Sequence, residues 1–326
     1  MVSKEDYKLL TNLLTMKEDT LYKFALLMLS KHYPKNRIEA RAGEYIIAFG
    51  TKPVGLLAHL DTVFPIKPTE DDLFFDSNRN VLWSSCGLGA DDRAGVFIIS
   101  KLLKYCRAHK QELPTIIFTL GEEKGGLGAS AFIADYPINH NGIKFLIELD
   151  RQGKDDSVYY DCGNKEFEEF INEFGFVTDW GTFTDISIIA PVWDVAAVNL
   201  SVGYFNEHTK TEMLFLNYLY ATFEKVKKIL GAATDKEFAF CKRNWYEDYL
   251  LHGADFNVIC KGCEGTFSAD TCIPFVTKNG GYAYICPDCL NEKFDSFSWC
   301  GFCGEMYDPA EETAGFCPKC LKKIIV

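Results

Sequence analysis

Side chains that could bind a metal or move a proton stand where apolar strands are predicted to end. His59 and Asp61 follow the apolar run 54–58 as His-Leu-Asp. In this arrangement His59 could ligate zinc while the carboxylate of Asp61 holds its second ring nitrogen. The alternative is a buried histidine with a carboxylate partner, because His-x-Asp is a common tripeptide.

Two pairs of adjacent carboxylates follow along the chain. Asp91 and Asp92 precede an apolar helix, where they could cap its exposed amides or where one of them could bridge two cations. Glu122 and Glu123 follow the strand predicted at 115–120, and adjacent glutamates there are costly unless they diverge or face positive charge. Either both lie in a solvated loop, or one of them binds a metal and the other takes a proton from an attacking water.

Two further candidates complete the set. Asp150 ends an apolar strand, and Glu148, two residues earlier, points to the same side. We favour Asp150 as a ligand because it lies at the strand terminus, although Arg151 could instead be its charged partner. His208 stands before a long predicted helix as the second histidine, or as an ordinary surface residue at a helix start.

The elements that must position these residues alternate between strand and helix, which predicts an α/β fold with a mixed, largely parallel sheet flanked by helices. The first 32 residues have a helical apolar pattern, and 50–53 is a hairpin-like or edge connection between two strands. The expected strands are 45–49, 54–58, 115–120, 144–149 and 197–202, and the later helices are 92–107, 129–136, 165–174 and 210–230. We expect a first domain over residues 1–240 and a cysteine-rich module over 241–326.

In these residues the sequence resembles the co-catalytic di-zinc exopeptidases, a superfamily of zinc aminopeptidases, tripeptidases and related deacylases. The resemblance covers roughly residues 45–215 and rests on five motifs in a fixed order. They are His59-Leu60-Asp61-Thr62, Gly89-Ala90-Asp91-Asp92-Arg93-Ala94-Gly95, Gly121-Glu122-Glu123, Asp150 and Asn206-Glu207-His208-Thr209.

The resemblance implies a role for each position. Asp91 would bridge two zinc ions, His59 and Asp150 would hold one of them, and Glu123 and His208 would hold the other. Glu122 would be the general base and acid, and Asp61 would orient His59. Co²⁺ or Mn²⁺ could occupy the same nitrogen and oxygen ligands.

The chain also departs from that pattern. Many relatives insert a sizeable domain that closes the site or supports assembly, whereas only 57 residues separate Asp150 from His208 here. Within that stretch, Thr182-Phe183-Thr184-Asp185 resembles a Thr-Asp motif of some relatives. Asp185 could bind a substrate amine, or it could serve only as a turn or cap residue.

Eight cysteines form four CxxC pairs in the C-terminal module, a spacing typical of zinc held by four thiolates. The two predicted sites comprise Cys260, Cys263, Cys286 and Cys289, and Cys300, Cys303, Cys317 and Cys320. Closed four-thiolate sites are structural, so these tandem zinc ribbons would stabilise a segment with little core of its own. Redox dithiols or disulfides are the alternative, and Cys272 could replace a ligand in the first ribbon.

Composition limits the partners. The formal net charge is −12, and residues 241–326 carry 8 basic against 12 acidic side chains, so nucleic acid and anionic membranes are disfavoured. A protein partner could bind the ribbons. The N-terminus lacks the apolar core of a signal peptide and no apolar run is long enough to cross a bilayer, so we expect a cytoplasmic protein.

The sequence therefore predicts a zinc-dependent metallopeptidase, most simply an aminopeptidase, with two co-catalytic and two structural zinc ions. Its substrate would be a peptide or a small acyl-amide. Deacylation, carboxypeptidase action or dipeptide cleavage on the same metals are the nearest alternatives. The other alternative is an inactive zinc-ribbon adaptor, although such a protein would have no need of both the base and every metal ligand.

Overall fold

The chain forms two compact units in a computed structural model, Met1–Arg243 and Asn244–Val326. The structure describes residues 3–139, 141–232, 236–242, 257–268, 271–277, 282–293, 297–300, 306–307 and 317–318. None of the helices in these ranges is both long enough and apolar enough to span a membrane.

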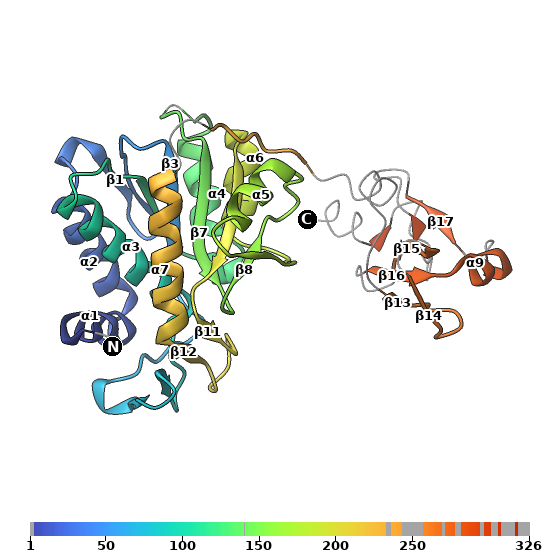
Figure 1. The fold of residues 1–326 in the computed structure, drawn as a ribbon, viewed down its shortest axis with the longest axis horizontal. Coiled ribbons are helices and arrows are strands. Elements are labelled where there is room, and N and C mark those ends of the chain that lie inside the picture. Colours follow the sequence, from blue (N-terminus) through green and yellow to red (C-terminus); the bar gives the residue numbers. More distant parts are fainter. Residues whose placement is uncertain are drawn as a thin grey trace. The chain divides into compact units, whose positions relative to one another are not determined.

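An eight-stranded mixed sheet forms the centre of the first unit (Figure 1). In spatial order its strands are β1 (Ile38–Arg41), β2 (Tyr45–Ala48), β6 (Thr115–Thr119), β3 (Val54–His59), β7 (Phe145–Arg151), β10 (Ala196–Ser201), β8 (Asp156–Val158) and β9 (Val177–Thr178). The four central strands β6, β3, β7 and β10 run parallel, so their carboxyl ends meet at one edge of the sheet. The predicted fold class, α/β with a largely parallel sheet, is confirmed.

Helices cover both faces of this sheet because its central strands are apolar on both sides. Leu56 and Ile116 pack into one hydrophobic core, while Leu57 and Ile117 point to a second core on the opposite face. The first core is closed by α1 (Lys4–Thr15), α2 (Glu18–Ser30), α3 (Ala90–Ala108), α5 (Lys165–Asn172) and α7 (Leu216–Ala232). The second is closed by α4 (Leu127–Asp135) and α6 (Ile186–Trp193).

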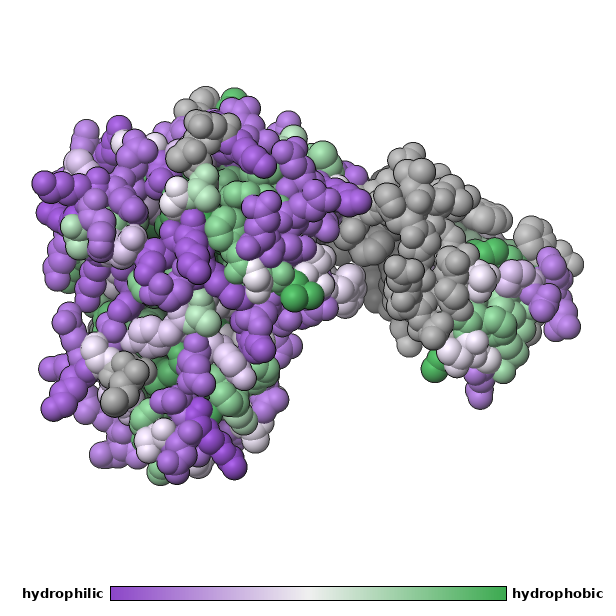
Figure 2. Space-filling view, in the orientation of Figure 1, coloured by the Kyte–Doolittle hydropathy of each residue, from purple (hydrophilic) through white to green (hydrophobic). Residues whose placement is uncertain are grey.

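A second, four-stranded antiparallel sheet was not predicted. Its strands are β11 (Tyr204–Phe205), β12 (Met213–Phe215), β5 (Val81–Ser84) and β4 (Leu73–Asp76), in that order. Short 3₁₀ turns complete the unit at η1 (Lys35–Arg37), η2 (Glu70–Asp72) and η3 (Glu122–Lys124). The face of this unit in Figure 2 is mostly hydrophilic, with small apolar patches, because the long apolar side chains are withdrawn into the two cores.

Two predictions about the elements are wrong. The segment 50–53 is not a hairpin, because β6 lies between β2 and β3, and the backbone N–H groups of Thr51 and Lys52 donate to the carbonyl of Leu113 just before β6. The helix predicted at 210–230 begins only at Leu216, since the preceding residues pair with β5 as strand β12.

The second unit contains short strands, most of them paired antiparallel, and one helix around a small apolar cluster. Its elements are β13 (Asn257–Ile259), β14 (Thr266–Ser268), β15 (Ile273–Val276), β16 (Tyr282–Ile285), α9 (Pro287–Lys293), β17 (Ser298–Trp299) and β18 (Met306–Tyr307). Cys260, Cys286 and Cys289 are themselves part of this cluster, beside Phe275 and Ile285. The apolar core of the unit is therefore built around cysteine sulfur atoms.

Candidate active site

The carboxyl ends of the central strands bring the predicted residues together. His59 ends β3 with its side chain 1% exposed, and its Nε2 lies 2.9 Å from Oδ1 of Asp91 and 3.3 Å from Oδ1 of Asp150. Its Nδ1 faces Oδ1 of Asp61 at 3.4 Å. The three side chains His59, Asp91 and Asp150 form the first candidate metal cluster, with ligand atoms within 4.8 Å of one another.

The adjacent residues Asp91 and Asp92 have different roles. Gly89, in a left-handed conformation at φ 69°, turns the chain into α3, and the peptide between the two aspartates is cis. Asp92 accepts the backbone N–H of Gly95 at 2.9 Å and that of His59 at 3.1 Å, so it is the capping residue. Asp91 instead directs its carboxylate into the cluster.

The other oxygen of Asp91 faces the second histidine. Oδ2 of Asp91 lies 3.2 Å from Nε2 of His208, and Oε2 of Glu123 lies 3.0 Å from the same nitrogen. These three residues form the second candidate cluster. His208 is 52% exposed and lies in the turn between β11 and β12 rather than at a helix start, with a positive φ of 62°.

The charges of these clusters fit a pair of divalent cations. Burial raises the pKa of Asp150 to about 7, against the opposing effect of His59. Asp91 and Glu123 raise the pKa of His208 to about 11. The positive charge of the histidines thus partly neutralises the negative charge of several buried carboxylates. Two zinc ions that share Asp91 would neutralise this charge more completely, and zinc accepts imidazole and carboxylate ligands.

Glu122 stands apart from both clusters, in the 3₁₀ turn η3 after β6. Its backbone N–H donates to Oδ1 of Asp61 at 3.3 Å, so Asp61, which faces the ring of His59, also holds this turn in place. Burial raises the pKa of the Glu122 carboxyl to about 9, and the negative charge of Asp150 adds to the shift. A half-buried carboxyl next to two candidate metal clusters is suited to proton transfer.

Asp185 is buried at the start of α6 and accepts a hydrogen bond from the hydroxyl of Thr119, while its Oδ1 has no hydrogen-bond partner among the described residues. Burial raises its pKa to about 6. The neighbouring Thr184 donates to Oδ2 of Asp150 at 3.2 Å. Glu148 points to the same side as Asp150 but accepts the N–H of Ile186 at 3.4 Å and lies outside both clusters.

Glu212 is a site residue that the sequence analysis missed. It is completely buried, and its two carboxylate oxygens accept the backbone N–H groups of Gly89 at 2.6 Å and Asp91 at 3.0 Å. Burial raises its pKa to about 7, although these N–H groups lower it. Its position four residues after His208 would have been the only sequence signal, and a glutamate in a predicted helix is ordinarily exposed.

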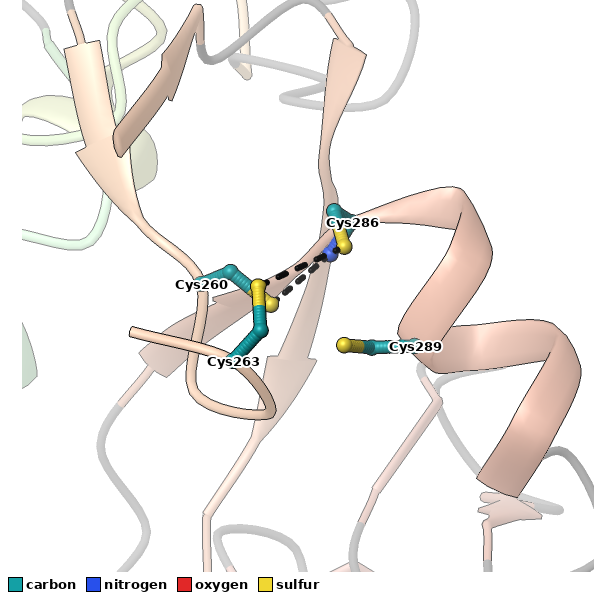
Figure 3. A group of neighbouring side chains, drawn as sticks. All are labelled: Cys260, Cys263, Cys286 and Cys289. Atoms are coloured by element: carbon teal, nitrogen blue, oxygen red, sulfur yellow. Dashed lines mark hydrogen bonds between the residues drawn. The ribbon is translucent and has the colours of Figure 1, made fainter. Parts of the chain in front are cut away.

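The second unit holds a separate cluster of four cysteines, in which the sulfur atoms of Cys260, Cys263, Cys286 and Cys289 converge (Figure 3). Cys260 and Cys263 come from the turn after β13, and Cys286 and Cys289 from the start of α9. Although burial raises the pKa of Cys260, backbone N–H groups, first that of Cys286, lower it to about 6. Four converging sulfurs with a stabilised thiolate fit a zinc ribbon.

Half of the second predicted cysteine set lies outside the described residues, namely Cys303 and Cys320. The other half, Cys300 and Cys317, is buried in one small cluster with Val276 and Tyr307. Cys272 lies in the apolar cluster beside the first four sulfurs. The pairing expected for the second ribbon therefore stays a prediction.

A protein-family model matches part of the first unit. Residues 47–175 match the model of Peptidase family M28, a range that includes the first cluster and both Glu122 and Glu123. Residues 47–175 therefore resemble a metallopeptidase of family M28, in agreement with the resemblance that the sequence motifs predicted. None of the curated proteins matches the chain in sequence.

Solved structures share the fold at low sequence identity. Aminopeptidase PepT from Bacillus cereus is 14% identical with a TM-score of 0.56, over 70% of this chain and 98% of that one. A tripeptidase from Staphylococcus aureus is 14% identical with a TM-score of 0.57, over 72% and 99% of the two chains. A TET aminopeptidase from a marine sediment thaumarchaeon is 13% identical with a TM-score of 0.55, over 71% and 98%.

Proposed function

We propose that the chain is an aminopeptidase that removes N-terminal residues from peptides with a pair of zinc ions. The main support for this proposal is that the two oxygens of one carboxylate face two different histidines. Oδ1 of Asp91 faces His59 at 2.9 Å, and Oδ2 faces His208 at 3.2 Å. A carboxylate with one ligand set on each oxygen is what a bridged pair of metal ions requires.

In this proposal His59 and Asp150 hold one zinc ion, Glu123 and His208 hold the other, and Asp91 is common to both. When bound, the two ions would lower the pKa of a shared water and polarise the scissile carbonyl. Co²⁺ or Mn²⁺ would also suit these ligands. Asp61 at Nδ1 of His59 fixes the ring so that Nε2 points into the cluster.

Glu122 is the proton carrier. Its carboxylate takes a proton from the attacking water and returns it to the amine that leaves when the peptide bond breaks. Asp61 holds the backbone of Glu122 at the same time as it orients His59.

A carboxylate beside the site favours a substrate with a free amine. Oδ1 of Asp185 has no partner among the described residues and would accept an N-terminal ammonium, while Thr119 fixes the other oxygen. Arg151, which follows the proposed ligand Asp150, is paired with Asp179 at 3.1 Å and is therefore not free to bind a substrate carboxylate. Deacylase, carboxypeptidase and dipeptidase activities are therefore the second choice.

The second unit would hold two structural zinc ions, one in each set of four cysteines. We propose that this unit binds a protein partner or regulates access of substrate, since its acidic charge disfavours nucleic acid. Its many thiols in the reduced state are consistent with residence in the cytoplasm.

The test is incubation of the zinc-loaded protein with a mixed library of free and N-acetylated peptides, followed by mass spectrometry. Sequential loss of N-terminal residues from the free peptides alone is the expected result. Cleavage from the carboxyl end, release of acetyl groups, or no cleavage by protein that retains all its zinc would each overturn the aminopeptidase proposal.

A further inference from the structure

Glu212 connects the two loops that supply the second metal cluster. Its carboxylate accepts the backbone N–H groups of Gly89 and Asp91, which lie more than 120 residues earlier in the chain. Its own N–H donates to the carbonyl of Thr209 at 3.1 Å, which closes the turn that carries His208. One side chain thus holds the Asp91 turn against the His208 turn.

Among the described residues, the only other polar contact between the two turns is that of His208 Nε2 with Oδ2 of Asp91 itself. Asp91 and Asp92 have non-helical backbone angles, so their N–H groups lie outside the regular hydrogen bonding of α3. The turn of His208 is largely exposed, and the Thr209 hydroxyl donates to the carbonyl of Asn206 within it at 2.7 Å. The buried carboxylate that accepts two N–H groups is the strong connection between the two turns. Each buried N–H left without a partner would destabilise the folded state.

We propose that Glu212 is a positioning residue that sets the separation of Asp91 from His208 and thereby determines the affinity of the second metal site. The inference rests on the proposed function, since it assumes that these residues bind a metal. Glu212 touches neither the substrate nor the metal in this account. It acts through the backbone of Asp91 and through the turn that carries His208.

Glu212→Gln is the sharpest test because it keeps the shape of the side chain. An amide has one acceptor oxygen, so its NH₂ group must face the N–H of Gly89 or of Asp91, donor against donor. Loss of such a supporting contact typically lowers metal affinity by about 10- to 100-fold. Glu212→Asp, one methylene shorter, is the second variant, and Glu224→Gln on the exposed side of α7 is the matched control.

The measurement is titration of the metal-free full chain with Co²⁺, followed by visible absorption. Cobalt bound to cysteine sulfur gives charge-transfer bands in the near ultraviolet, which separates the ribbon sites from the histidine and carboxylate sites. We expect wild type and Glu224→Gln to bind two Co²⁺ tightly at the latter sites. Glu212→Gln should bind the first normally and the second about 10- to 100-fold more weakly, and excess Zn²⁺ should restore its kcat.

The outcomes separate this inference from the proposed function. If wild type binds both ions and Glu212→Gln binds them equally well, the positioning role of Glu212 is wrong, but the proposal of a two-metal site is still supported. The same holds if Glu212→Gln lowers the melting temperature of the metal-free protein while the second affinity is unchanged. If wild type itself binds no second ion at these residues, the two-metal function fails and the inference fails with it.

Discussion

Asp61 contacts both His59, a proposed metal ligand, and Glu122, the proposed base: its Oδ1 lies 3.4 Å from Nδ1 of His59 and accepts the backbone N–H of Glu122 at 3.3 Å. A single carboxylate therefore fixes the ring of His59 and the turn η3. Because both contacts use the same oxygen, a change at Asp61 would disturb the ligand and the base together.

Replacement of the proposed base should stop turnover and leave the metals in place. We expect Glu122→Gln to lower kcat by about 10²- to 10⁴-fold, the usual contribution of a positioned acid or base, with the zinc content unchanged. Peptide hydrolysis and elemental analysis of the same preparation measure both quantities. Glu112→Gln, at an exposed glutamate that precedes β6, should behave as wild type. Zinc lost in parallel with activity would instead make Glu122 a ligand.

The amine-binding role of Asp185 predicts a loss that depends on the substrate. Asp185→Asn keeps the hydrogen bond from Thr119 but removes the negative charge, so kcat/KM for peptides with a free N-terminus should fall by about 10-fold or more. The corresponding change at the exposed Asp179 should have a much smaller effect on the same peptides. An equal loss for both variants, or none for Asp185→Asn, would remove Asp185 from substrate recognition.

Much of the candidate site could be predicted from the sequence, because its side chains follow strand ends and parallel strands meet at one edge of the sheet. His59 and Asp150 are of this kind. Glu212 could not be predicted, since it acts on backbone N–H groups of a distant turn and no local pattern reports such a contact. The position of β6 between β2 and β3 was missed for a related reason: strand order depends on the crossover through α3 rather than on the short segment 50–53.

The ribbon cysteines should matter for the second unit and little for the chemistry of the first. We expect Cys286→Ser to bind one zinc ion fewer and to make the chain after residue 243 sensitive to protease, because structural zinc supplies roughly 10–16 kcal/mol of folding free energy in small ribbons. Cleavage of short peptides should persist. Cys241→Ser, an exposed cysteine outside the four sulfurs, is the control and should retain all its zinc.

An ion pair near the N-terminus predicts a pH-dependent stability. Asp6 accepts from Nζ of Lys101 at 2.7 Å and from the hydroxyl of Tyr220 at 2.9 Å, which connects α1 to α3 and α7. Although burial raises the pKa of Asp6, these two hydrogen bonds hold it below its ordinary value of 3.8. The folded state therefore binds fewer protons than the unfolded state just below that pH, so the stabilisation is complete above it and is lost as the pH falls.

Asp6→Asn should accordingly lower the free energy of unfolding by about 1 kcal/mol at pH 7, and the difference from wild type should shrink below pH 3.8. Urea unfolding followed at several pH values measures the difference. Asp19→Asn, at the exposed start of α2, should show no such trend. A difference that stays constant with pH would mean that packing, and not the charge of Asp6, is responsible.

The proposed function requires that one carboxylate, that of Asp91, is shared by two metal ions. Crystals of the zinc-loaded protein, measured on both sides of the zinc absorption edge, test it directly. We expect two anomalous peaks about 3.5–4 Å apart, with Asp91 between them, His59 and Asp150 at one and Glu123 and His208 at the other. A single peak, or two peaks of which only one touches Asp91, would contradict it.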